Sequence, residues 1–205
     1  MIISYHQNKE SKEESKLEQM DWTIPGTTLK IKRSDACRTG ELFYTMFMAG
    51  DITLSQVCSI TGLESYMVQN WVKRGFLTNP KNKRYSMRQL CRIININMLK
   101  SALPMESICS LLTYVNGHLD DESDDLIDDS ALYFMFVHLA AQAGRINSVE
   151  ERNALIAQAM ETYQEPVPGA KERVEKVLRI MLTAWASARL RQDAEQMLRD
   201  LNISY

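Results

Sequence analysis

The chain has 205 residues, of which 45% are apolar and 24% are charged, and this is the composition of an ordinary globular protein. No apolar run approaches the roughly 20 residues needed to cross a bilayer, and the opening MIISYHQNKESKEESKLEQ lacks the apolar core of a signal peptide. We therefore expect a cytoplasmic protein that does not contact a membrane.

Charge is distributed unevenly along the sequence. Residues 1–100 contain 15 Lys and Arg against 9 Asp and Glu, whereas residues 101–205 contain 9 against 17. The stretch from Ser65 to Met105 has no acidic residue, and a basic stretch of this kind is typical of a surface that binds a polyanion. Its basic residues are Lys73, Arg74, Lys81, Lys83, Arg84, Arg88, Arg92 and Lys100.

The sequence lacks the motifs of common metal and catalytic sites. Its cysteines form no C-x-x-C pair and match no zinc-site spacing, so we interpret them as small buried side chains in a reducing compartment. No phosphate-binding glycine loop, G-x-S-x-G or H-E-x-x-H is present. We expect no metal, no cofactor and no enzymatic activity. The cysteines are Cys37, Cys58, Cys91 and Cys109.

The first 50 residues contain few strong signals. Residues 1–37 are interpreted as a flexible or extended N-terminal arm, because the first 21 are polar and poor in apolar side chains. Pro25-Gly26 indicates a turn, and the TTLKIKR that follows is typical of a short extended piece. The apolar run from Glu41 to Met48 predicts a short helix that ends near Gly50.

The most informative segment begins at Thr53. This residue is suited to cap a helix over 54–61, with Gln56 as the reciprocal partner of a capping box, and Gly62 ends the helix. A second helix is predicted over 64–74. Two short helices joined by a tight turn with glycine are typical of a helix-turn-helix.

The second of these helices has one apolar and one polar face. Its apolar positions recur at helical spacing, and Trp71 is interpreted as a core aromatic in preference to a contact residue. The polar face carries side chains that pair with base edges or phosphates. These are Ser65, Gln69, Asn70, Lys73 and Arg74.

A small basic wing is predicted directly after the second helix. Phe76-Leu77 is expected to anchor a short strand, residues 79–82 to form a turn, and residues 83–85 to return from it. Basic side chains at such a tip add salt-sensitive, sequence-independent affinity for DNA. Ser86 is the predicted N-cap of a helix over 87–101, and Pro104 starts the next helix.

The segment LSQVCSITGLESYMVQNWVKRGFLTNPKNKRYSMRQLCRIININMLKSALPMESICSLL resembles the MerR-type winged-helix family, within a unit of about 53–116. More specifically, it is similar to an uncharacterised bacterial domain family with a MerR-like N-terminal part. Departures include Trp71 at a usual tyrosine position and Gln89 at a usual aspartate position. The resemblance implies that Ser65, Gln69, Asn70, Lys73 and Arg74 face the major groove or its phosphates. It also implies that Lys81, Lys83, Arg84 and Tyr85 form the wing contact, and we add Arg88 to this DNA-binding set.

The C-terminal half is more acidic and strongly helical in pattern. Residues 118–129 (HLDDESDDLIDD) fail the EF-hand pattern and are interpreted as a solvated acidic loop, which would also repel DNA and so orient the basic face. The almost wholly apolar helix over 130–144 is expected to be capped by Ser130, closed by Gly144 and buried, with His138 as a satisfied core histidine.

Two further helices are predicted. Ser148 caps a helix over 149–163, and a long helix follows over 170–201 with a broad apolar stripe. A helix of roughly 45 Å exceeds the width of a small bundle. It is expected either to break near Arg189 or to pack against a second copy of the chain.

These observations predict a mainly α protein, with a MerR-like winged helix-turn-helix domain over 38–117 and a helical C-terminal domain over 130–205, joined by the acidic loop. The predicted function is a transcriptional regulator that binds double-stranded DNA as a homodimer through its C-terminal helices; any effector is unknown. The alternative is a protein–protein interaction module built on a winged-helix fold that does not bind DNA.

Overall fold

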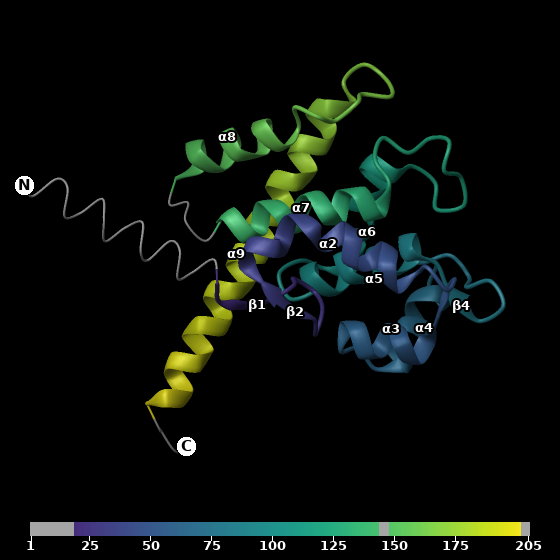
Figure 1. Ribbon diagram of the computed structural model, residues 1–205, viewed down its shortest axis with the longest axis horizontal. Coiled ribbons are helices and arrows are strands. Elements are labelled where there is room, and N and C mark those ends of the chain that lie inside the picture. Colours follow the sequence, from purple (N-terminus) through teal and green to yellow (C-terminus); the bar gives the residue numbers. More distant parts are fainter. Residues whose placement is uncertain (1–18, 144–147, 202–205) are drawn as a thin grey trace, which may run out of the picture.

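The computed structural model describes residues 19–143 and 148–201 and is mainly helical (Figure 1). Within these ranges, no helix is both long enough and apolar enough to cross a membrane. The α-helices are α2 (Thr39–Met46), α3 (Leu54–Thr61), α4 (Ser65–Lys73), α5 (Met87–Leu99), α6 (Met105–Asn116), α7 (Asp129–Ala143), α8 (Val149–Ala159) and α9 (Ala170–Asp200). The remaining elements are β1 (Asp21–Thr23), β2 (Lys30–Lys32), the 3-10 helix η1 (Arg33–Arg38), β3 (Ile52–Thr53) and β4 (Arg84–Tyr85).

Helix α5 lies at the centre of the molecule. It contacts α3 and α6 of the predicted winged domain over 38–117, and α7 and α9 of the predicted C-terminal domain. One hydrophobic core joins residues from both halves, so the predicted boundary at 118–129 does not separate two cores. This packing explains why nine of the thirteen α5 residues are buried, including Leu90, Ile93, Ile94 and the polar Arg92 and Asn95.

The N-terminal segment is part of this core from residue 21 onward. Strands β1 and β2 form an antiparallel hairpin, which confirms the expected extended piece. Ile24 is fully buried, and the backbone N–H of Thr28 donates to the carbonyl of Ile60 on α3 at 2.8 Å. Residues 22–37 are therefore packed and partly extended rather than flexible, and residues 1–18 of the predicted flexible or extended arm lie outside the described residues.

Gly26 is a point of close approach between this hairpin and α5. Its φ is +75°, and a Cβ built there would lie 2.8 Å from the carbonyl oxygen of Ile94 and 3.2 Å from Cβ of Met98. We expect Gly26→Ala to lower the free energy of unfolding by about 3 kcal/mol, from left-handed strain and overpacking together. Gly75 has the same φ with nothing within 4 Å. Gly75→Ala should therefore cost only about 1 kcal/mol, and urea denaturation showing equal losses would contradict the packing argument.

Most of the predicted helix caps are confirmed. Thr53, Ser86 and Ser148 each form the N-cap of a capping box, as their side chains accept from the residue three positions on. Ser130 is not the cap of α7, and that prediction was wrong. The carboxylate of Asp128 accepts from the N–H groups of Ser130 and Ala131 at 2.7 and 3.3 Å, so the helix begins one residue earlier.

The ends of the C-terminal helices differ from expectation. Helix α8 ends at Ala159 rather than at residue 163, because Met160 leaves helical geometry and the N–H of Glu161 closes a turn onto Gln158. The expected end of α7 at Gly144 lies outside the described residues. Helix α9 runs without a break through Arg189 to Asp200, so the first of the two alternatives for this helix was wrong.

Candidate nucleic-acid interface

Helices α3 and α4 and strand β4 lie together at one end of the molecule (Figure 1). Gly62, with a φ of 69°, ends α3, and α4 begins at Ser65 after a short connection. Strand β4 pairs with β3 in the register Ile52 with Tyr85. The expected strand at Phe76-Leu77 does not form, because β4 pairs with β3 instead, but Leu77 is buried in the core as an anchor residue would be.

Helix α4 exposes the polar face that its sequence predicted. Val68 and Trp71 are buried beneath it, which confirms Trp71 as a core aromatic. One exposed residue of this helix was missed by the sequence analysis, namely Tyr66, which is 67% exposed. Asn70 follows Tyr66 by four residues, which places both side chains on the same face of a helix, so the sequence contained a signal that Tyr66 is exposed. The predicted residues that are exposed here are Ser65, Gln69, Asn70, Lys73 and Arg74.

A tight turn over residues 81–84, called the basic turn below, precedes β4. The N–H of Arg84 donates to the carbonyl of Lys81 at 2.8 Å, and both central residues have positive φ, 51° at Asn82 and 60° at Lys83. These angles resemble a type I′ turn, whose twist matches that of paired strands. Lys81, Asn82, Lys83 and Arg84 are all exposed, so the turn presents its cations to solvent.

The basic turn and α4 share one surface. A cavity of about 440 Å³ lies between them, and its walls include Gln69 from α4 and Lys83 from the turn. Leu54 at the start of α3 lines the same cavity. Two segments that are separate in the sequence thus contribute side chains to one groove.

Not every predicted contact residue is available on this surface. Tyr85 is 3% exposed and packs in the core, so it is removed from the contact set. Arg84 remains exposed, although its guanidinium donates to the carbonyl of Asp51 at 2.8 Å. Arg74 pairs with Glu106 at 2.9 Å and stacks over Phe76.

Three lysines of this surface differ from its arginines in the interactions of their side chains. Among the described residues, no ion pair involves Lys73, Lys81 or Lys83, and all three are exposed. Exposed, unpaired ammonium groups are suited to neutralise phosphates with little loss of internal interactions. These lysines are therefore the strongest cationic members of the candidate interface.

Arg88 lies beside the surface of α4 and the basic turn, but carboxylates of the acidic segment, residues 118–129, pair with it. Its guanidinium makes a two-point contact with Asp125, at 2.8 Å from Nη1 and 3.1 Å from Nη2, and Nη1 lies 3.3 Å from Glu122. Burial raises the pKa of Asp125 to about 6, against the opposing effect of Arg88. The expected solvated loop is thus an ion-paired element, and no local sequence signal indicates this long-range contact.

A second, buried pair ties α5 to the start of α7. Arg92 and Asp129 are 4% and 1% exposed and lie 3.3 Å apart, and the guanidinium of Arg92 also donates to the carbonyl of Phe76 at 3.1 Å. Burial raises the pKa of Asp129 even though Arg92 and Arg88 oppose the shift. This pair links the candidate interface to the C-terminal half through charge as well as packing.

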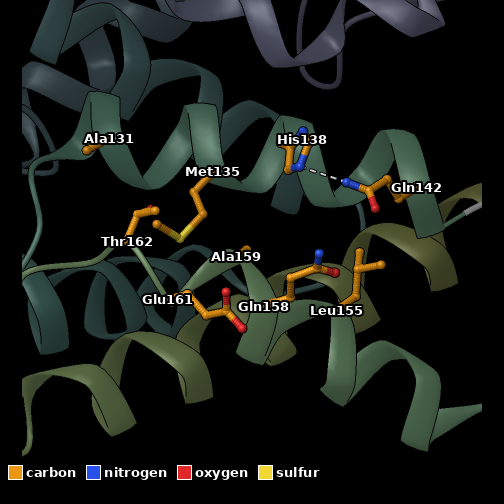
Figure 2. A pocket seen from close by; sticks show the side chains of 9 residues that line it. All are labelled: Ala131, Met135, His138, Gln142, Leu155, Gln158, Ala159, Glu161 and Thr162. Carbon is orange, nitrogen blue, oxygen red and sulfur yellow. Dashed lines mark hydrogen bonds between the residues drawn. The ribbon is translucent and has the colours of Figure 1, made fainter.

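A separate cavity of about 520 Å³ opens between α7 and α8 (Figure 2). Met135 and His138 of α7 face Leu155 and Gln158 of α8 across it, with Glu161 just beyond the end of α8. His138 is half-buried, and its Nε2 lies 2.7 Å from the amide nitrogen of Gln142, consistent with a satisfied histidine. Within the described residues, no three His, Cys, Asp or Glu are grouped so as to hold a metal ion.

The chain is similar to proteins that have no described function. Residues 48–136 match the domain of unknown function DUF1836, a range that includes α3, α4, the basic turn and the acidic segment. The uncharacterised protein YkrK of Bacillus subtilis (strain 168) is 34% identical over 86 residues. Those residues make up 40% of this chain and 37% of that protein, so the similarity spans well under half of the relative. No solved structure matches the chain.

Proposed function

We propose that the protein is a DNA-binding transcriptional regulator built on a MerR-like winged helix-turn-helix. In this proposal α3 and α4 form the helix-turn-helix, α4 is the recognition helix, and the basic turn with β3 and β4 is the wing. The observation that carries the proposal is the shared groove of Gln69 and Lys83, flanked by unpaired lysines. Amides read base edges in the major groove, and wing cations neutralise phosphates.

Titration of a fluorescent duplex with the purified full chain tests this function. If the lysines neutralise phosphates, the logarithm of the association constant falls linearly with the logarithm of salt concentration, and affinity drops steeply between about 50 and about 200 mM salt. Absence of binding at the lower concentration would overturn the proposal. It would favour the alternative of an interaction module.

The distal part of α9 supports the proposed homodimer. The proximal part of the helix packs in the core, whereas every residue from Arg189 to Leu201 is exposed and this end projects from the body (Figure 1). Among these residues, Leu190, Met197 and Leu201 are 64–70% exposed. An apolar face of this kind needs a partner, and we infer that the partner is a second copy of α9.

Sequence spacing along α9 gives the geometry of this pairing. Exposed residues recur with alternating steps of three and four, the heptad spacing of a coiled coil. In an antiparallel pairing centred near residue 188, Ser187 lies opposite Leu190 of the second copy, and Arg179 lies near its Asp200. The small Ser187 thus leaves room for the larger Leu190, and opposite charges flank the seam. The exposed residues of this seam are Ile180, Thr183, Ser187, Leu190, Ala194, Met197 and Leu201.

Substituting one seam residue is expected to dissociate the dimer. The wild-type chain should have a mass in solution about twice its 23.6 kDa, and Leu190→Glu should yield the monomer, because it places a charge inside the buried seam. Gln192→Glu is the matched control, since position 192 is exposed and lies off the seam. Light scattering after size exclusion measures the mass. A monomeric wild type, or a dimeric Leu190→Glu protein, would contradict the proposed interface.

A further inference from the structure

The acidic segment 118–128, called the acidic strap below, is fixed at its C-terminal end. Leu126 and Ile127 are buried, and the N–H of Leu126 donates to the carbonyl of Val115 at 2.7 Å. The side chains of Asn116 and Tyr163 donate to the carbonyls of Ile127 and Leu126. The strap therefore has a defined position beside α5 and does not behave as a solvated tail.

The N-terminal part of the strap is exposed and carries most of its charge. Asp120, Asp121, Glu122 and Asp124 are all exposed, and Glu122 remains 80% exposed while it pairs with Arg88. The N–H of His118 donates to the carboxylate of Asp124, which folds this part back on itself. The strap thus presents a compact set of carboxylates that are not needed to fill the core.

Two of these carboxylates, Asp120 and Glu122, line a cavity beside the base of the wing. A cavity of about 400 Å³ separates the strap from the turn before β4, and its walls include Asp120 and Glu122 on one side and Asn79 and Lys81 on the other. Arg88, at the start of α5, lines the same space. The strap therefore places negative charge next to the cations that the proposed function assigns to DNA.

We propose that the acidic strap is an autoinhibitory element that competes with DNA phosphates for the basic face. Its carboxylates occupy Arg88 and lower the positive potential around Lys81, so that DNA binds tightly only when the strap is displaced or neutralised. A carboxylate and a phosphate both accept from a guanidinium, so a phosphate can take the place of the exposed Glu122 at Arg88 while Asp125 keeps its contact. This inference rests on the proposed function, because it concerns the same DNA-binding face.

The test neutralises the two exposed carboxylates that face the wing. Asp120→Asn with Glu122→Gln leaves Asp125 and Asp129, which support the fold, unchanged. We expect this variant to bind a random-sequence duplex about tenfold more tightly than the wild type at about 100 mM salt, because repulsion of the phosphates is removed. The matched control is Glu150→Gln with Glu161→Gln, which changes net charge equally at exposed positions on or beside α8, away from α4 and β4 (Figure 1).

The outcomes separate this inference from the proposed function. Tighter binding by the strap variant than by both the wild type and the control supports the inference. Equal affinities of the strap variant, the control and the wild type overturn the inference and leave DNA binding intact. Absence of binding by all three proteins overturns both.

Discussion

Replacing Lys83 and Arg84 together by glutamate is expected to weaken binding to duplexes of every sequence by about a hundredfold or more. Both residues are exposed on the basic turn, and Lys83 lines the groove shared with α4. The double variant removes two cations and adds two anions where the phosphate backbone is proposed to lie. The slope of the logarithm of the association constant against the logarithm of salt concentration should become shallower, by the amount that about two phosphate contacts contribute. Fluorescence anisotropy over a salt series measures this slope.

The matched control reverses two charges elsewhere. Lys171→Glu with Lys176→Glu makes the same change in net charge near the start of α9, away from the candidate interface (Figure 1). It should reduce affinity only slightly, because screening confines charge effects to about 8–10 Å. A wing variant that binds as tightly as this control would show that the basic turn does not contact DNA. Thermal melts of both variants establish that they are folded.

The second large effect is on stability. Asp129→Ala leaves the guanidinium of Arg92, which is 4% exposed, without its buried carboxylate. Removing one partner of a buried ion pair destabilises proteins by about 3–5 kcal/mol. We therefore expect Asp129→Ala to lower the free energy of unfolding by about that amount in urea denaturation. The hydrogen bond from Asn95 to the backbone carbonyl of residue 129, at 3.4 Å, is kept in this variant, so the loss reports on the ion pair.

An apolar replacement of the whole pair is the control. Arg92→Met with Asp129→Leu removes both charges and fills similar space, and such exchanges are often close to neutral. The double variant should be clearly more stable than Asp129→Ala. If instead the two proteins unfold at the same urea concentration, the unpaired arginine does not cause the loss, and the charge argument is wrong.

Local features of this fold were predictable because their causes lie within a few residues. Thr53 and Ser86 cap helices through partners three positions away, and Gly62 ends α3 with a positive φ. The helical spacing around Trp71 likewise placed this residue in the core. Each of these signals depends on side chains and backbone groups that are adjacent in the chain, so the sequence contains the whole interaction.

The features that sequence reasoning missed depend on contacts between distant segments. Arg88 is 37 residues from Asp125, and only the packing of α6 and α7 around α5 brings them together. Tyr85 follows the exposed Arg84 on the two-residue strand β4, and it lies in the core opposite Ile52, a residue 33 positions earlier that is also buried. A basic residue in the sequence therefore identifies a candidate contact, whereas its availability is decided by the fold.

The central claim is that α4 and the basic turn bind duplex DNA with sequence preference. Selection of bound fragments from a random duplex pool by the purified full chain, at about 100 mM salt, tests it most directly. The proposal predicts an enriched motif with two-fold symmetry and half-sites about one helical turn, or a multiple of it, apart. It also predicts that the motif is absent from a selection with the Lys83→Glu/Arg84→Glu protein. A pool that shows no enriched motif after selection by the wild type would contradict the claim.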